Sequence, residues 1–566
     1  MAAPDTNSLK YFHGRFEALK KERTTFDEHW KELSRYLAPR RGRFITSDRN
    51  KGERAWKEII NSAGAQAFKV FRNGMLSGVM SPTRQWFELG VDDPKLMESQ
   101  AVKVWLQEVT AQITRVFNQS NLYNMSPVFL GELGMYGTAA MSHEDDFDTV
   151  ARFYTHTAGS YVIAQNDKYQ VDTFGRVFEM TTIQMARKFG LENLSQPIRR
   201  AYDNSNYEDW WVVYHLIEPN PNYDPTRKTN GFKKFRSCYF EPGANIGSSS
   251  DKFLSKSGFS RFPVYVGRWE TTAEDIYGTD CPGMLSLGDV KMLQQQEKEL
   301  ARSIRLQNLP AFRGPATLAS KDIDLQSGNV TLYDTDSAQN QLQPVYQPNA
   351  DVNSMALDIR RTETRIAQAW YNDLFLAITQ MEGVQPRNQL ELSQRNQERL
   401  LQLGPVLERL HNEFLTPMVD RTFERLVEIS TDQNGNWLDR SVIPPPPPEL
   451  QGKDVSPKYI SSIAIAQRAA GTGPIEQGLA FVAGLVGSGL SDGLKIDGDQ
   501  AIDEHLSRIG TPARIVRPDD EVAKMREERQ RMAQAAQMAE VAATGAKAGK
   551  DLMQAQSAGQ QQGARR

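Results

Sequence analysis

The chain is poor in cysteine, with only Cys238 and Cys281 among its 566 residues. Two cysteines exclude a disulfide framework and a cysteine-rich zinc site, and they are typical of a protein that folds in a reducing compartment. Long apolar runs are also missing, because residues 479–490 fall short of the ~20 that a bilayer span needs. The first residues lack the apolar core of a signal peptide. We therefore expect a soluble chain that makes no contact with a membrane.

An excess of positive charge is missing as well. The chain has 67 basic and 70 acidic residues and a net charge of −3. A protein that holds nucleic acid tightly over a large surface usually has a basic excess, so this composition excludes such a binder. Hydrophobic residues make up 39% and charged residues 24%, which favours several folded regions with much exposed polar surface.

Catalytic motifs are absent too. The sequence contains no P-loop, no zinc-protease His-Glu-x-x-His and no Gly-x-Ser-x-Gly nucleophile turn. The glycines between residues 487 and 493 miss the spacing of a dinucleotide-binding loop. One acidic cluster, residues 143–148, could bind a divalent metal, but such clusters are more often solvated turns without metal. We predict that the chain is not an enzyme and needs no cofactor or metal.

The first forty residues predict a long amphipathic helix. Apolar side chains recur every three or four residues from Leu9 to Leu37, except where Arg23 takes the expected apolar place, and Pro39 ends the pattern. This spacing indicates that Phe16, Trp30 and Leu33 pack in a core. A second helix is expected over residues 55–80.

Between residues 153 and 270 the pattern changes to short β-rich runs separated by turn residues, which indicates an α+β region. The four expected strands are Tyr161–Ala164, Trp210–Ile217, Ser237–Phe240 and Pro263–Trp269.

Two long helices, expected at residues 284–308 and 352–376, bracket a β-rich insertion at residues 309–351. A third, bent helix is expected to end near residue 429. On the first of these helices four cations share a face that lies about 130° from the apolar stripe; they are Lys291, Lys298, Arg302 and Arg305. Such a face is usually solvated or pairs with acids of another subunit, and contact with DNA is the third possibility.

The remaining segments are polar or irregular. The proline run at residues 444–448 is typical of a stiff spacer. Residues 456–515 resemble several short helices, and residues 519–566 begin as a charged helix and become rich in Ala, Gln and Gly.

Taken in order, these segments resemble the head-to-tail connector (portal) family of podoviruses. The resemblance covers nearly the whole chain. The matching blocks are Trp30–Pro39, Asn61–Pro82, Trp86–Leu89, Ser120–Leu122, Gly134–Ala139, Pro263–Trp269, Tyr277–Gly278, Pro282–Gly283, Leu403–Leu410, Glu413–Pro417, Tyr459–Ser462 and Ala466–Arg468. The chain departs from the family pattern at Gly383–Arg387, in the stretch that corresponds to the tunnel loop.

The resemblance implies a mainly α protein with an α+β wing, which forms a ring, as a dodecamer in this family. The implied regions are a wing with N-terminal helices (1–283), a first stem helix (284–308), a clip (309–351), a second stem helix (352–376), a tunnel loop (377–388), a crown (389–518) and a C-terminal barrel or tail (519–566). They match the pattern of two helices around a β-rich insertion.

The resemblance also implies a function and partners. The ring would sit at one capsid vertex of the virion, pass double-stranded DNA inward and outward without sequence preference, and be assembled in the host cytoplasm. Implied protein partners are the large terminase subunit, scaffold, major capsid protein, tail adaptor and internal ejection proteins. Candidates for the DNA channel are Lys291, Lys298, Arg302, Arg305, Gln380, Glu382 and Arg387, and candidates for motor or tail docking in the clip are Arg313, Lys321, Asp322 and Asp324.

Another structural protein of the virion is the alternative. A major capsid protein is not expected to have two helices around a β-rich insertion. An internal ejection protein is expected to have a stronger membrane-active segment than residues 479–490. A terminase is excluded by the missing P-loop.

Overall fold

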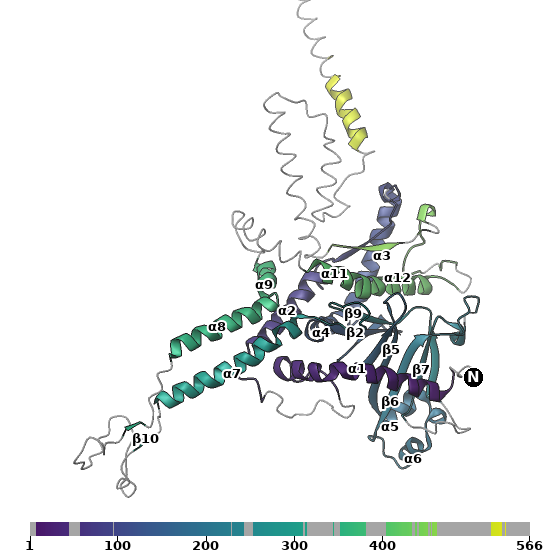
Figure 1. Cartoon of the computed structure of the whole chain (residues 1–566). Coiled ribbons are helices and arrows are strands. Elements are labelled where there is room, and N and C mark those ends of the chain that lie inside the picture. Colours follow the sequence, from purple (N-terminus) through teal and green to yellow (C-terminus); the bar gives the residue numbers. More distant parts are fainter. Residues whose placement is uncertain are drawn as a thin grey trace, which may run out of the picture. The chain divides into compact units, whose positions relative to one another are not determined.

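The computed structural model of the chain describes residues 7–44, 57–242 except 94 and 228, 253–308, 312–313, 343–344, 351–380, 403–460 except 433–435, 439–440, 451–452 and 454, and 522–534 with 538. Contacts divide the chain into two compact units. The first comprises residues 1–92, 106–445 and 452–467, and the second comprises the rest. The fold mixes helices and antiparallel sheets (Figure 1).

Helix α1 (Leu9–Leu37) begins at Ser8, whose side chain accepts a hydrogen bond from the Tyr11 amide. Its apolar stripe is buried, and Phe16, Trp30 and Leu33 are 1%, 0% and 0% exposed. Arg23 is buried in the same stripe and donates from Nη1 to the carbonyl oxygens of Gly159 and Tyr161. A buried cation therefore fastens α1 to the strand β4 (Tyr161–Gln165).

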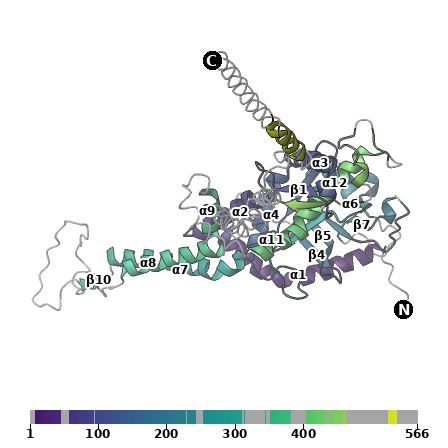
Figure 2. The same cartoon turned by 90° about the horizontal axis from the view of Figure 1, so that it is seen from above.

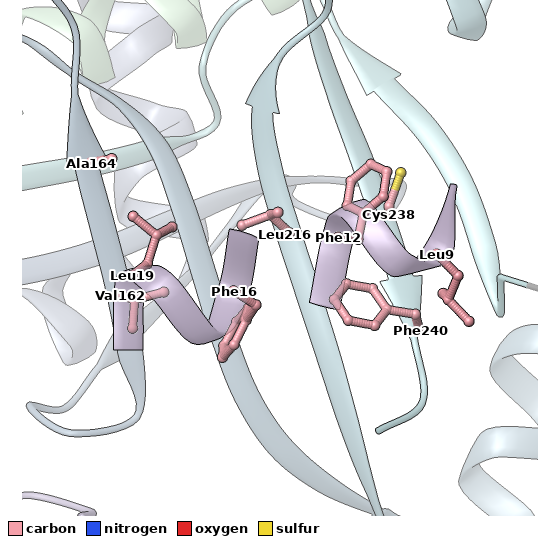
Figure 3. Packing of buried hydrophobic residues seen from close by; sticks show 9 residues of the cluster. All are labelled: Leu9, Phe12, Phe16, Leu19, Val162, Ala164, Leu216, Cys238 and Phe240. Carbon is pink, nitrogen blue, oxygen red and sulfur yellow. The ribbon is translucent and has the colours of Figure 1, made fainter. Parts of the chain in front are cut away.

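A five-stranded sheet with the order β4-β5-β6-β7-β8 forms much of the first unit. Its other strands are β5 (Val171–Thr181), β6 (Trp210–Pro219), β7 (Phe235–Phe240) and β8 (Ser255–Phe259). One face packs on the N-terminal half of α1, where Phe12 and Phe16 meet Leu216 of β6 (Figure 3). Successive side chains of a strand point to opposite faces of the sheet, so Val213 lies on the face opposite to Leu216. There it packs with α5 (Thr182–Phe189) and α6 (Gln196–Asp203).

A second sheet has the order β3-β2-β9, with β2 (Thr138–Asp146) in the centre, β3 (Val150–His156) on one side and β9 (Val264–Arg268) on the other. The four predicted strand runs lie in β4, β6, β7 and β9. Of the strands in these two sheets, the prediction missed β2, β3, β5 and β8. β2 ends in His143–Asp146, which we interpreted as an acidic turn, whereas the structure pairs these residues with β3. That interpretation was wrong because the cross-strand ladder overrides the low β-propensity of Asp and Glu.

Helices α2 (Ala63–Val79) and α4 (Leu122–Tyr136) pack together near the sheet β3-β2-β9. The prediction started α2 at residue 55, which was wrong, since residues 57–62 are not helical. The amides of Ile60 and Asn61 donate to the side chain of Gln294 instead of joining a helix.

Helix α7 (Pro282–Asn308) is joined to the sheet by backbone contact. A Cβ on Gly278 would lie 2.1 Å from the Gly137 carbonyl oxygen, just before β2, and a Cβ on Gly283 would lie 2.4 Å from the Met135 carbonyl oxygen. Only glycine allows two backbones to approach so closely. The start of α7 is therefore fixed against the end of α4 and the start of β2.

The predicted helix 352–376 is two helices, α8 (Val352–Ala369) and α9 (Asn372–Gln380). Tyr371, with φ of +54°, separates them in the left-handed region. The single-helix prediction was wrong because the side chain of Trp370 donates a hydrogen bond to Ser286 of α7 and the chain turns there. Residues 377–380, expected in a loop, are the last residues of α9.

The third predicted helix contains α11 (Gly404–Leu410), a π-helical turn (His411–Leu415) and α12 (Thr416–Ser430). Pro417 lies in the first turn of α12 and has no N–H to donate, which is consistent with the widened turn before it. Five apolar residues along this stretch are buried, namely Leu403, Leu407, Leu410, Phe414 and Met418. Glu413 in the π turn accepts from the backbone and side chain of Arg268 at 2.6–3.0 Å.

The smaller elements of the first unit are the pair β1 (Phe87–Gly90) and β12 (Ser456–Tyr459), and the pair β10 (Phe312–Arg313) and β11 (Gln343–Pro344). Helix α3 (Gln100–Gln119) begins in the second unit and continues into the first. The second unit also contains two 3-10 turns, at Leu96–Glu98 and Pro448–Leu450, and a helical stretch at residues 522–534. Among the residues that the structure describes, no helix is both long and apolar enough to span a bilayer.

Candidate functional site

The helical hairpin formed by α7 and α8 is the principal candidate site. The two helices are in contact and run side by side in Figure 1, and Figure 2 shows the same hairpin from above. Their shared core lies at the base, where Val290 and Leu293 of α7 and Ile366 of α8 are fully buried. Asp289 pairs with Arg365 at 3.0 Å beside this core. The base is therefore fixed, while the cations further along α7 are exposed to solvent.

A polar clasp joins the base of the hairpin to the chain before α2. The side chain of Gln294 accepts from the amides of Ile60 and Asn61 at 2.7 and 2.9 Å, and it donates to the Asn61 carbonyl at 3.0 Å. The amide of the Asn61 side chain donates to Glu297 of α7 and Glu363 of α8, each at 2.8 Å. One neutral side chain thus bridges two carboxylates on different helices. Sequence reasoning assigned Asn61 only to a family block and gave no sign of this role.

The predicted basic face divides into two parts. Lys291 donates to Glu32 of α1 at 2.8 Å, and this hydrogen bond lowers the pKa of Glu32. Lys291 is therefore an ion-pair partner within the chain, a role that the sequence analysis did not consider. Lys298, Arg302 and Arg305 are exposed along the distal part of α7.

The distal end of the hairpin is closed by a short backbone ladder. Phe312 pairs with Pro344 and Arg313 with Gln343, so the chain leaves after α7 and returns before α8 at the same place. Of the predicted docking residues, Arg313 lies in this ladder. Lys321, Asp322 and Asp324 lie outside the described residues, as do Glu382 and Arg387. Gln380 is the last residue of α9.

The acidic cluster at residues 143–148 does not converge on a metal. Glu144, Asp145 and Asp146 pair with three different cations, which are Arg176 at 3.5 Å, Arg421 at 3.4 Å and Arg152 at 3.4 Å. His143 is fully buried and bonds through Nδ1 to the Tyr265 hydroxyl at 2.7 Å. Burial lowers the pKa of His143 well below its ordinary value. Across the part of the chain that the structure describes, no three metal-ligating side chains come together.

A half-buried arginine forms an ion pair with a buried carboxylate. Arg41 forms an ion pair at 3.0 Å with Glu132, which is 1% exposed. Burial raises the pKa of Glu132, and the cation opposes this effect. Glu132 also accepts from the Ala158 amide at 3.0 Å and from the Thr157 hydroxyl. This group connects the chain after α1 to α4 and to the segment before β4, and it has a structural role.

The comparison with protein families decides the identity. A family model described as "Bacteriophage head to tail connecting protein" matches residues 9–516. The chain belongs to this family. The portal protein of Salmonella phage epsilon15 is 38% identical over 534 residues, which cover 94% of this chain and 93% of that protein. The probable portal protein of Bordetella phage BPP-1 is 36% identical over 541 residues, which cover 95% and 94%.

The resemblance to podovirus connectors is therefore confirmed, and the chain is a head-to-tail connector, or portal, protein of the virion. Two solved structures were also similar. They are the virion of a native gene transfer agent particle (TM-score 0.28, 9% identity, 60% of this chain and 72% of that chain) and the neck of an empty particle of this kind, with C6 symmetry (TM-score 0.31, 9% identity, 78% and 93%). These TM-scores are too low for the two structures to bear on the argument.

Proposed function

We propose that copies of this chain form a closed ring, dodecameric as in the family, at one vertex of the capsid, and that DNA passes through its centre. The observation that carries the proposal is the α7–α8 hairpin, which is fixed at its base and holds a chain segment at its tip. A ring of such hairpins encloses a channel whose wall is made of stiff helices. Family membership over residues 9–516 supports the same reading.

The ring needs a surface that each copy presents to the next, and a closed ring uses two different patches on each copy. Some apolar side chains on the hairpin are exposed to solvent. Leu285 and Met292 lie two turns apart on one face of α7 and are 68% and 39% exposed, and Leu357 of α8 is 53% exposed. We assign these three side chains to contact with a neighbouring copy.

The channel should hold DNA weakly, because DNA must move through it in both directions. Each neutralised phosphate adds affinity through counterion release, and a ring multiplies every contact by its copy number. We propose that Lys298, Arg302 and Arg305 supply the few cations that face DNA, together with Gln380, Glu382 and Arg387 of the proposed tunnel loop. Lys291 is less suited to this role, because Glu32 already neutralises it.

The regions keep the predicted assignment as part of this proposal. Residues 1–283 would form the wing, 309–351 the clip, 389–518 the crown and 519–566 the C-terminal barrel or tail. The stem would be 284–308 and 352–376, divided by the break between α8 and α9, and the tunnel loop would be 377–388, whose first four residues end α9. The clip would dock the terminase motor and later the tail adaptor through Arg313, Lys321, Asp322 and Asp324. Scaffold, major capsid protein and internal ejection proteins are further proposed partners, and assembly would take place in the host cytoplasm.

We further propose that the chain has no catalytic activity and that a separate motor supplies the energy for packaging. Purified protein should neither hydrolyse ATP nor cut DNA. An ATPase activity that co-purifies with the rings and disappears after a point mutation in this chain would overturn this part of the proposal.

Electron microscopy of the purified full chain tests the ring. We expect isolated rings with a central hole, whereas a capsid protein would give shells and an internal ejection protein would give no rings. The double variant Leu285→Asp, Met292→Asp should give monomers, because it places charge in the contact between copies. The control Tyr223→Asp changes a side chain that is 50% exposed in the loop after β6, so its rings should persist. Full ring yield in the double variant would show that this face is not the contact.

A further inference from the structure

The hairpin between β2 and β3 carries an aromatic side chain entirely in solvent. Phe147 is 105% exposed, more than any other large apolar residue that the structure describes. It lies in the turn between Asp146 and Val150, at the tip of the hairpin. Single exposed apolar residues are common on protein surfaces, so Phe147 acquires meaning only from how the tip is held and what surrounds it.

The turn has a defined shape rather than a loose one. The carboxylate of Asp146 accepts from the Thr149 hydroxyl at 2.7 Å, and the Ala151 amide donates to the Thr149 carbonyl at 2.7 Å. Val150 has φ of +67°, a conformation that a β-branched residue rarely adopts. Backbone strain of this kind persists where the surroundings enforce it.

The strand below the tip is fastened on two sides. Glu144 pairs with Arg176 of β5, and Asp145 pairs with Arg421 of α12. β2 is also the central strand of its sheet, between β3 and β9. Phe147 is therefore presented on a rigid support, and such pre-organisation lowers the entropy lost on binding.

The tip belongs to a different element from the surface assigned to neighbouring copies. β2 begins at Thr138, beside Gly278 and the start of α7, and runs nine residues from there to Asp146, about 3.3 Å per residue. α7 leaves the same junction in its own helix and carries Leu285 and Met292. The tip therefore belongs to β2, whereas Leu285 and Met292 of the proposed contact belong to α7, and both elements start beside the contact between Gly137 and Gly278.

Acidic residues flank Phe147 in the sequence, and Arg152 of β3 pairs with one of them, Asp146, at 3.4 Å. Asp145 keeps 47% of its side chain exposed although it pairs with Arg421, and Asp148 beside Phe147 is exposed. An exposed phenyl ring next to the exposed carboxylates Asp145 and Asp148 is complementary to an apolar socket with a rim of lysine or arginine. Aromatic anchors in such sockets contribute much of the affinity of protein interfaces, and the charges around them set rate and specificity.

We propose that Phe147 docks into a protein other than a copy of this chain, and that this protein offers an apolar socket with a basic rim. The inference rests on the proposed ring, because the ring assigns the contact between copies to α7 and α8. It goes beyond that function in naming a further docking surface and the chemistry of its partner.

A photoreactive benzoylphenylalanine at position 147 of the full chain, in particles assembled in infected cells, tests the partner directly. We expect cross-links to a peptide of another virion protein that contains apolar residues and Lys or Arg. The matched control places the same group at Tyr223, which is 50% exposed, and should give few cross-links. Cross-links from position 147 mainly to another copy of this chain, or no more than from position 223, would overturn the proposal.

Substitutions test whether the phenyl side chain of Phe147 is needed for docking. Phe147→Ser should leave ring formation of purified protein unchanged and reduce the number of rings incorporated per particle about tenfold or more, as loss of an interface anchor does. Phe147→Leu keeps an apolar side chain and should incorporate nearly normally, and Asp148→Lys should reduce incorporation. Normal incorporation of Phe147→Ser contradicts the docking role. If purified Phe147→Ser forms no rings, the docking role is also contradicted, because Phe147 is then needed for contact between copies. If the unchanged protein forms no rings, the proposed function is contradicted instead.

Discussion

Trp30 lies at the centre of an aromatic cluster in the first unit. Its ring is 5.5 Å from that of Tyr277, 5.6 Å from that of Phe26 and 6.0 Å from that of Tyr136. These partners come from α1, α4 and the loop before α7. The side chain is 0% exposed, so it joins three parts of the chain that are distant in sequence.

We predict that Trp30→Ala lowers the free energy of unfolding by about 3–5 kcal/mol, because it removes the largest side chain of the cluster and leaves a cavity. Trp30→Phe should cost less, since it keeps an aromatic ring and removes the indole Nε1–H, which is buried without a hydrogen-bond partner. Urea denaturation followed by circular dichroism measures both. Lys31→Ala, next to Trp30 and half-exposed, is the control. Equal stability of Trp30→Ala and the unchanged protein would contradict the burial.

Buried histidines predict an acid-sensitive fold. Burial lowers the pKa of His143, His156 and His215 well below the ordinary value, and nearby arginines act in the same direction. These histidines stay neutral in the folded state, whereas the unfolded chain takes up protons below about pH 6.5. Stability is therefore fully present above that pH and is lost as the pH falls.

Relative to pH 7.5, each of these histidines should lower the free energy of unfolding by about 1.4 kcal/mol at pH 5.5. Asp420 acts in the opposite direction. Burial raises its pKa to about 6 in the folded protein, so the folded state binds this proton more readily than the unfolded chain and gains stability as the pH falls. Denaturation at the two pH values measures the net change. Between pH 7.5 and 5.5 the free energy of unfolding of His143→Gln should fall by about 1.4 kcal/mol less than that of the unchanged protein, whatever the stability of the variant at pH 7.5. An unchanged pH dependence in this variant would show that His143 does not titrate differently in the two states.

Single residues also show what a sequence pattern can and cannot predict. The periodicity of α1 predicted that Phe16 and Trp30 would be buried and marked Arg23 as the exception. It could not predict the carbonyl oxygens of Gly159 and Tyr161 that make a buried arginine acceptable there. Those acceptors lie more than a hundred residues away, and a local pattern contains no information about them.

At the scale of elements, the clasp at Asn61 determines how α7 and α8 are held together. Its side-chain amide lies between Glu297 and Glu363. If the amide is removed, two carboxylates on neighbouring helices face each other without a donor between them.

We predict that Asn61→Asp separates the hairpin at its base, because a third carboxylate joins the two already there and each loses its hydrogen bond. The cost should be about 1–3 kcal/mol for the lost partners, with like-charge repulsion in addition. Hydrogen exchange of α7 and α8, followed by mass spectrometry, should show faster exchange near Gln294 and little change in β4–β8. Gln66→Glu, an exposed change in α2, is the control. Unchanged exchange in α7 would mean that the clasp does not hold the hairpin.

The elements differ in how far the sequence predicted them. Helices α1, α7 and α12 have strong apolar periodicity, and their presence was predicted. The break between α8 and α9 was not, since no Gly or Pro marks residues 369–372 and the turn depends on the hydrogen bond from Trp370 to Ser286. β2 was missed for a related reason: its acidic end is stabilised by arginines from β3, β5 and α12, which are tertiary partners.

At the scale of the whole molecule, the near-neutral composition bears on how the ring treats DNA. With 67 basic and 70 acidic residues the chain has no basic excess, and one cation of α7, Lys291, already pairs with Glu32. Lys298, Arg302 and Arg305 are exposed on the helix that we propose to line the channel.

We predict that the triple variant Lys298→Gln, Arg302→Gln, Arg305→Gln forms rings but retains less double-stranded DNA at low salt. The slope of log affinity against log salt should become shallower, by about 0.9 for each phosphate that is no longer neutralised. Filter binding at several salt concentrations measures this slope. Lys10→Gln, Lys20→Gln, Lys21→Gln removes the same charge from α1 and should leave the slope unchanged. If both triple variants behave alike, net charge rather than position accounts for the binding.

The order of the family blocks identified the whole molecule better than any single element. Blocks such as Asn61–Pro82, Gly134–Ala139 and Pro263–Trp269 are separated by long stretches in sequence but are neighbours in the first unit. They are recognisable because their small and aromatic residues fit one another closely. The candidates for docking and for the tunnel loop lie mostly outside the described residues, and they remain predictions.

The contact between Gly278 and Gly137 also has a mechanical consequence. Two backbones in direct contact leave no side chain that could rearrange under load. A force applied along α7 is therefore passed to β2 and its neighbours in the sheet rather than absorbed at the joint. The hairpin and the sheet should therefore move as one rigid body, so that a displacement of the stem also displaces the strands of the sheet.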